Sequence, residues 1–210
     1  MSRITALLAL VVLATACQTQ AQPAPTPVPS PSPHTAPTAA VLQPAEVPTG
    51  LAPCASNGPI DAYLTALAAA NPAIAGTASS QWTGMHAGGA AAGAISIYAA
   101  DPSACNAELG ATSNVKSVTS FVAEFADPGE ADRAWGSGVF GFAPPAPAEV
   151  VPGVTRGTST GLGLSSFTYV RTPITLASWH RSVFVALVVM NLVDVTTFKA
   201  ATVAVDARLN

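Results

Sequence analysis

Apolar residues recur at helical spacing near both ends of residues 54–210. In the first segment, residues 60–68 place their apolar side chains on one face, and Asn71-Pro72 ends the pattern. In the second, Asp194 is expected to cap the helix. The apolar face of this second helix comprises Val195, Phe198, Thr202, Val205 and Leu209. The spacing therefore predicts one amphipathic helix at each end of this region.

Alternating or continuous apolar runs predict strands between these helices. Residues 94–99 and 116–125 read as strands, and the second places Phe121, Ala123 and Phe125 on one face. Residues 164–171 alternate in the same way. The segment 178–191 contains a run, residues 183–190, that is apolar on both faces and therefore fits a central strand. This run is too short to span a membrane.

Two of the strands end in the same way. Segments 99–109 and 125–135 each run from a strand through Ala-Asp-Pro into a short helix. In each segment the Asp is suited to cap the helix and the Pro to occupy its first turn. The similarity is either an internal duplication or two equivalent solutions to starting a helix after a strand, and the sequence leaves both open.

This order of elements predicts an α+β fold, in which helices pack on a mainly antiparallel sheet. The region from residue 54 to residue 210 has the length of one ordinary domain. We therefore expect a single α+β domain over residues 54–210.

The first residues have the pattern of an export signal. Arg3 is followed by the apolar run 4–13, and we interpret residues 1–16 as a signal peptide. Ala14-Thr15-Ala16-Cys17 resembles the lipobox of bacterial lipoproteins. The resemblance implies that Cys17 receives a lipid, becomes the first residue of the mature protein and anchors it to the extracytoplasmic side of the membrane. The alternative is ordinary cleavage after Ala16 and secretion.

Residues 17–53 differ sharply in composition from residues 54–210. They are rich in Pro, Ala, Thr and Ser, and Glu46 carries their only charged side chain. Such a segment buries little apolar surface, and its prolines favour an extended backbone. The composition therefore predicts a disordered stalk between the lipid and the domain.

Charge and cysteine content restrict the partners and the compartment. The chain carries 8 Lys and Arg against 11 Asp and Glu, without a basic cluster, which argues against nucleic acid as a partner. With Cys17 assigned to lipid, Cys54 and Cys105 remain as a pair. In an oxidising compartment we expect a structural disulfide between them, with a reactive or metal-binding thiol as the alternative.

The motifs tested for chemistry do not lead to a catalytic, metal or cofactor site. GSGVFG at residues 136–141 matches the dinucleotide-binding motif G-x-G-x-x-G. That motif needs a strand before it and a helix after it, whereas here a predicted helix precedes it and a Pro-rich loop comes after it. His86 and His180 lack a G-x-S-x-G partner motif and metal-ligand spacing. We therefore predict no catalytic residue, no metal ligand and no cofactor.

One aromatic and basic cluster remains as a candidate binding surface. Trp179, His180 and Arg181 start the segment 178–191, where solvent-facing side chains are expected. Amphipathic aromatics beside a guanidinium are typical anchors at interfaces. Trp135, by contrast, is expected to face the core from its helix.

The layout of the chain also has a family resemblance. A strand, Asp-Pro, a helix and a Trp over residues 121–135, then two strands and a closing helix over residues 164–209, resemble exported sensor-type domains of actinobacterial lipoproteins and receptor kinases. The resemblance implies ligand or partner sensing in the cell envelope, and our leading hypothesis is a non-catalytic domain that binds a small ligand or an envelope protein. An exported hydrolase with a scattered site and a passive structural lipoprotein are the alternatives.

Overall fold

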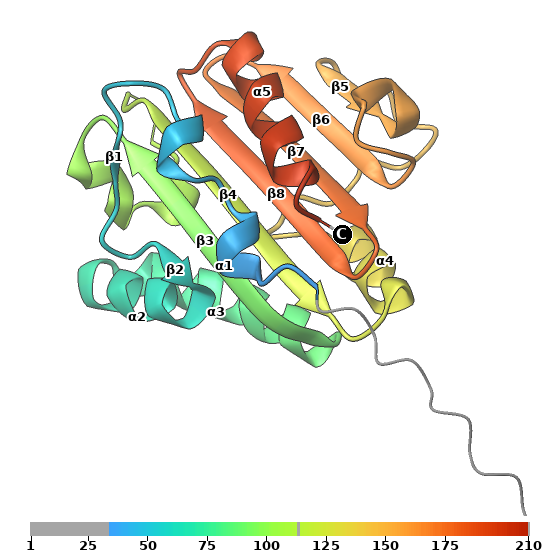
Figure 1. The fold of residues 1–210 in the computed structure, drawn as a ribbon, viewed down its shortest axis with the longest axis horizontal. Helices are drawn as coiled ribbons and strands as arrows, with labels where there is room; N and C mark the ends of the chain where they lie inside the picture. Colours follow the sequence, from blue (N-terminus) through green and yellow to red (C-terminus); the bar gives the residue numbers. More distant parts are fainter. Residues whose placement is uncertain (1–33, 113, 210) are drawn as a thin grey trace, which may run out of the picture. The chain divides into compact units, whose positions relative to one another are not determined.

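An antiparallel sheet lies at the centre of the computed structural model, which describes residues 34–112 and 114–209 (Figure 1). Within this part of the chain the sheet has eight strands, in the order β1-β3-β4-β8-β7-β6-β5, with β2 also paired to β3. Neighbouring strands pair antiparallel. The strands are β1 (Ala52–Pro53), β2 (Gly58–Pro59), β3 (Ala90–Ala99), β4 (Ser117–Phe125), β5 (Val154–Arg156), β6 (Ser166–Arg171), β7 (Ile174–Arg181) and β8 (Phe184–Asn191).

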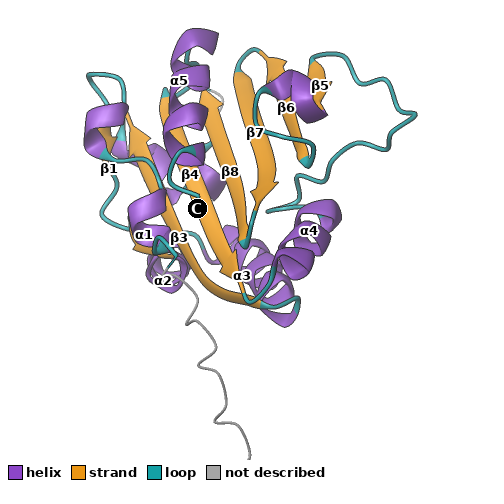
Figure 2. Cartoon of the chain, turned by 45° about the vertical axis from the view of Figure 1, so that its right-hand side comes forward, coloured by secondary structure: helices purple, strands orange, loops and turns teal. Residues whose placement is uncertain are grey.

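Helices cover both faces of the sheet, so the predicted α+β class is confirmed (Figures 1 and 2). One face packs against α2 (Ile60–Ala70), α3 (Pro72–Ala87) and α4 (Pro128–Ser137), and the other against α1 (Pro37–Ala40) and α5 (Val195–Asp206). Short 3-10 turns complete the described elements: η1 (Pro44–Glu46), η2 (Pro102–Asn106), η3 (Glu108–Gly110) and η4 (Gly157–Thr160). No helix of the described residues is long and apolar enough to cross a membrane.

Alternation along the central strands feeds two hydrophobic cores. In β8, Val185, Leu187 and Val189 face the α2–α4 side, whereas Phe184, Ala186, Val188 and Met190 face the α1 and α5 side. All residues of β8 are buried, which confirms residues 183–190 as the core of a central strand. Such burial on both faces is why the run shows no polar alternation.

Several predicted local signals are confirmed. Asp127 accepts hydrogen bonds from the backbone N–H groups of Gly129 and Glu130 at the start of α4, and Asp194 accepts one from Thr197 at the start of α5. Asp101 caps η2 in the same way, although that turn is only a 3-10 helix. The sulfur atoms of Cys54 and Cys105 lie 1.96 Å apart, so these residues form the predicted disulfide.

Two element boundaries differ from the prediction. Asn71-Pro72 ends α2 as expected but also starts α3, because the Asn71 side chain caps the new helix and Pro72 occupies its first position. The predicted single strand 178–191 is the end of β7 and all of β8, which are joined by a tight turn at Ser182. Ser182 has φ of 53°, a backbone region that glycine usually occupies.

The boundary between stalk and domain is also different from the prediction. Residues 37–47, which we call the strap, pack across the α5 side of the sheet and bury Ala40, Val41 and Leu42. The Leu42 N–H donates to Ser120 Oγ at 2.8 Å. Apolar side chains and satisfied backbone groups thus hold this segment, so the folded unit includes the strap instead of beginning at Cys54. Cys17 and residues 18–33 of the predicted stalk lie outside the described residues.

Candidate functional site

The structure places Trp179, the first residue of the predicted binding surface at the end of β7, inside the protein and not in solvent as expected. Trp179 is fully buried in the core on the α5 side, and its indole N–H donates to Asp206 Oδ1 at 3.0 Å. Arg181 donates to both oxygens of the same carboxylate, at 2.6 and 2.7 Å. Trp179 and Arg181 therefore join β7 to α5; Trp179 is withdrawn from solvent, whereas the Arg181 side chain remains 38% exposed.

His180 lies on the opposite face of β7 from Trp179 and joins that strand to α4. Its Nε2 atom lies 2.6 Å from the Ser182 carbonyl oxygen, and its Nδ1 atom lies 3.5 Å from Asp132 Oδ1. Ser165 Oγ donates to the same Asp132 oxygen at 3.0 Å. In a Ser-His-Asp triad the serine hydroxyl would bond to one nitrogen of the imidazole. In His180 the nitrogen available for this, Nε2, contacts the carbonyl oxygen of Ser182 instead. This arrangement suits a structural clamp.

His86 is no closer to such an arrangement. It lies on the exposed side of α3, where its ring meets Trp82 edge-on at 6.3 Å. Within the described residues, no group of three or more His, Cys, Asp or Glu side chains is placed to hold a metal ion.

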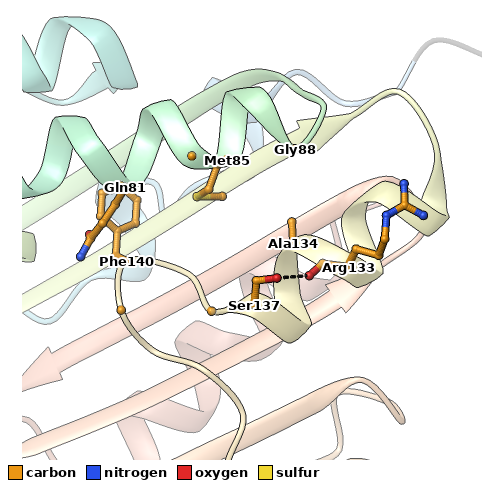
Figure 3. Close-up of a pocket in the computed structure, with 10 residues that line it drawn as sticks. Gln81, Met85, Gly88, Arg133, Ala134, Ser137 and Phe140 are labelled. Carbon is orange, nitrogen blue, oxygen red and sulfur yellow. Dashed lines mark hydrogen bonds between the residues drawn. The ribbon is translucent and has the colours of Figure 1, made fainter.

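A cavity of about 460 Å³ opens between α3 and α4, and we call it the first cavity (Figure 3). In Figure 3, Gln81 and Met85 line it from α3, Ala134 and Ser137 line it from α4, and Phe140 lines it from the loop after α4. The remaining lining residues are Gly84, Gly88, Arg133, Gly138 and Gly141.

Small residues at the facing positions create this space. Gly84 stands in the helical part of α3, and a Cβ atom built on it would have no heavy atom within 4 Å. Ala134 stands across from it on α4. Larger side chains at these two positions would fill the cavity with atoms of the protein itself. The two helices thus leave room for a ligand because their sequences are small at the interface.

The loop after α4 shapes the floor of the first cavity. Gly138 ends the helix with φ of 103°, and a Cβ atom there would lie 3.0 Å from Ala143 N. Phe140 comes next with φ of 46°, a region disfavoured for a bulky side chain. Its ring packs edge-on against Phe121 at 4.8 Å, and this packing holds the residue in place. Of the glycines of GSGVFG, Gly138 and Gly141 therefore make the turn under the cavity, whereas Gly136 still lies in α4.

Two polar groups interrupt the apolar lining. The Oε1 atom of Gln81 is buried without a hydrogen-bond partner, which is costly for an amide carbonyl. Arg133 stands at the edge, and no ion pair of the described residues involves it. Ser137 is already engaged, because its hydroxyl donates to the Arg133 carbonyl at 2.9 Å. Because the Gln81 oxygen has almost no accessible surface, the cavity offers a ligand one cation, Arg133, and apolar walls.

Sequence reasoning missed this site because it did not predict α3 as a helix. The core-facing residues of α3 are Ala75, Ala78, Trp82 and Met85, and two alanines among four give a weak apolar stripe. The available signal was the presence of Gly76, Gly84 and Gly88 near one Trp and one Met, since a glycine inside a helix has a packing or functional reason.

Comparisons of the chain with protein-family models, with curated proteins and with solved structures found no match. The case for a function therefore rests on the geometry of the first cavity and on the sequence of the N-terminus.

Proposed function

We propose that the protein is a lipid-anchored, extracytoplasmic binding protein whose folded domain holds a small, largely apolar ligand in the first cavity, without catalysis. The observation that carries the proposal is the largely apolar cavity of about 460 Å³ between α3 and α4, with Arg133 at its edge. Cavities of roughly 300–1,000 Å³ with apolar walls and a few placed polar groups are typical of small-molecule sites. The anchor rests on Cys17 in Ala14-Thr15-Ala16-Cys17.

Two contributions favour the binding of a ligand in the cavity. An anionic group of the ligand would lie beside the Arg133 guanidinium at the edge of the cavity. Contact with Met85, Ala134 and Phe140 would remove apolar surface from water at the same time.

Neither alternative from the sequence has comparable support. A hydrolase would need a nucleophile and a base in contact, and the hydroxyl of Ser165 is bonded to Asp132 rather than to His180. A purely structural lipoprotein would not need a cavity of this size between two helices.

Filling the first cavity should abolish binding without unfolding the protein. In a Gly84→Leu variant the new side chain enters open space at a helical position, and we expect at least a tenfold loss of affinity for anilinonaphthalene sulfonate, an apolar anion whose fluorescence rises on binding. Gly76→Leu is the matched control, since Gly76 lies on the same helix, also next to open space, and does not line the first cavity. Equal affinities in the two variants would contradict the proposal, provided both unfold in urea like the parent protein.

The anchor is tested separately. A Cys17→Ala variant should move from the membrane fraction to the soluble extracytoplasmic fraction, because the lipid attaches to the thiol that the variant lacks. Mass spectrometry of the parent protein should show an N-terminal Cys17 carrying acyl chains. An unmodified N-terminus that begins after Ala16 would support plain secretion instead.

A further inference from the structure

A second cavity, of about 380 Å³, lies next to the first on the same side of the sheet. The two cavities share Gln81, Phe140 and Gly141 as wall residues. The other residues that line the second cavity come from α3, from the segment 108–111, from the loop after α4 and from the sheet: Thr77, Glu108, Leu109, Ala111, Phe142, Ile174 and Val189. Glu108 carries the one charged side chain among these ten residues.

The protein itself leaves the charge of Glu108 unpaired. None of the ion pairs among residues 34–112 and 114–209 includes this carboxylate. Glu108 is half-buried, so its side chain has lost part of its contact with water. A carboxylate in such surroundings is stabilised by an opposite charge within a few ångströms. A cation bound in the second cavity would supply that charge.

Two aromatic rings line the cavity together with this carboxylate. Phe140 and Phe142 belong to the loop after α4, and Phe140 is held by its edge-on contact with Phe121 at 4.8 Å. The face of an aromatic ring attracts a cation, and this attraction grows where water is excluded. A carboxylate and aromatic rings in an otherwise apolar lining therefore favour an organic cation over a neutral molecule or an anion.

The backbone that carries this lining is fixed in two uncommon turns. Leu109 has φ of 50° and Phe140 has φ of 46°, a region that bulky side chains seldom adopt. The Leu109 N–H donates to Tyr63 Oη at 3.2 Å, and its carbonyl accepts from Thr119 Oγ1 at 2.6 Å. Residues held in such conformations cluster at ligand sites, and here two of them line one cavity.

We propose that the second cavity binds an organic ammonium ion, a protonated amine with an apolar body. The ammonium group would donate hydrogen bonds to the Glu108 carboxylate, and the body would lie against Phe140 and Phe142. The ligand of this site has the opposite charge to the one that Arg133 favours in the first cavity. The inference therefore goes beyond the proposed function and does not depend on it.

The test compares three probes that share a phenyl ring and differ in charge: 2-phenylethylammonium, 2-phenylethanol and 3-phenylpropanoate. In titration calorimetry on the whole chain we expect the ammonium ion to bind about tenfold more tightly than the alcohol. The same preference should remain in Gly84→Leu, because Gly84 lines the first cavity and not the second.

Two results would overturn the inference and leave the proposed function standing. One is an ammonium ion that binds no more tightly than the alcohol or than 3-phenylpropanoate. The other is the loss of ammonium binding in Gly84→Leu, which would place that ligand in the first cavity.

A charge variant and a ring variant locate the site. Glu108→Gln keeps the size of the side chain but removes its charge, and it should weaken the ammonium ion about tenfold while leaving the alcohol within about twofold. Glu149→Gln is the matched control, since Glu149 is exposed and does not line the second cavity. Phe142→Leu removes a ring and should weaken the ammonium ion about threefold more than the alcohol.

Urea unfolding shows whether each variant keeps its fold. Equal affinities of Glu108→Gln and Glu149→Gln for the ammonium ion would overturn the role of the carboxylate. Equal losses for the ammonium ion and the alcohol in Phe142→Leu would overturn the role of the ring.

Discussion

Asp206 holds Trp179 in the interior of the protein, although the sequence favoured Trp179 as a surface anchor. Its carboxylate accepts hydrogen bonds from the buried indole of Trp179 and from the guanidinium of Arg181. The exposed fraction of the Asp206 side chain is 20%, so water screens these bonds only in part. A single carboxylate thus holds the indole of Trp179 inside the protein and the guanidinium of Arg181 beside it.

Replacing Asp206 should destabilise the fold more than replacing a comparable surface acid. We expect Asp206→Ala to lower the free energy of unfolding by about 2–3 kcal/mol, because the Trp179 N–H stays buried without an acceptor. Asp132→Ala is the control: its side chain is 57% exposed, and its loss should cost less than about 1 kcal/mol. Urea unfolding followed by tryptophan fluorescence measures both, and equal losses would show that Trp179 does not depend on Asp206.

The role of a residue could not be predicted from the sequence where its partner lies far away along the chain. Asp127 and Asp194 could be predicted as caps, because a cap bonds to backbone a few residues ahead. The partner of Trp179 lies 27 positions away on another element, and no local spacing identifies it. For the same reason the sequence could not show that the Gln81 Oε1 atom lacks a hydrogen-bond partner, because this depends on which groups of other elements lie near it.

At the scale of the elements, one partly buried ion pair and the hydrogen bonds beside it hold the strap against the rest of the domain. Arg208 near the C-terminus forms an ion pair with Glu46 and donates to the backbone carbonyls of Ala40 and Val41. Burial alone would raise the pKa of Glu46, but the hydrogen bonds from Arg208 and from the Gln43 N–H outweigh it and lower the pKa below the ordinary value of 4.5.

The strap should therefore contribute stability that depends on pH. A carboxylate with a lowered pKa in the folded state stabilises the protein above its ordinary pKa, and this contribution is lost as the pH falls through the lowered value. We expect Glu46→Gln to be about 1 kcal/mol less stable than the parent protein at neutral pH, and the difference to shrink below pH 4.5. Urea unfolding at a series of pH values measures it. If the stability difference between Glu46→Gln and the parent protein stayed constant at low pH, the effect would come from packing and not from the charge of Glu46.

Elements were predictable where apolar periodicity was strong and were missed where small residues dominate. Strands β3, β4 and β8 have clear apolar runs, and α5 has a wide apolar face. The strap resembles a stalk in composition because its prolines and alanines outnumber Val41 and Leu42, whose burial needs a sheet that is formed by later residues. Composition alone cannot show which segment finds such a surface.

At the scale of the whole molecule, the disulfide joins the start of the sheet to the turn after β3. Cys54 comes directly after β1, and Cys105 lies in η2, 51 positions later. The bridge therefore closes a loop that contains α2, α3 and β3.

Removing this bridge should lower the stability of the fold without changing its secondary structure. For a loop of this length the chain-entropy model gives about 4 kcal/mol, so the Cys54→Ala, Cys105→Ala double variant should unfold at clearly lower urea concentration. Circular dichroism checks that helix and strand content is kept. Two reactive thiols at these positions in the unreduced, folded protein would contradict the bridge.

The α+β class and the single folded unit could be predicted from the order of elements, because each amphipathic face needs a partner layer. The sheet order could not, since β8 lies between β4 and β7 and the chain returns to the centre from the far edge. The neighbouring cavity of about 380 Å³ depends on this order, because Ile174 of β7 and Val189 of β8 line it together with Gln81 of α3 and Phe140 of the loop after α4.

The strap and the first cavity lie on opposite faces of the same sheet. If the N-terminal segment is held at a membrane, any pulling force enters the domain through the strap. The load then falls first on Leu42, Ser120 and the Glu46–Arg208 pair, and not on α3 or α4. A force that detached the strap would thus act on the face of the sheet opposite to the two helices that form the ligand cavity.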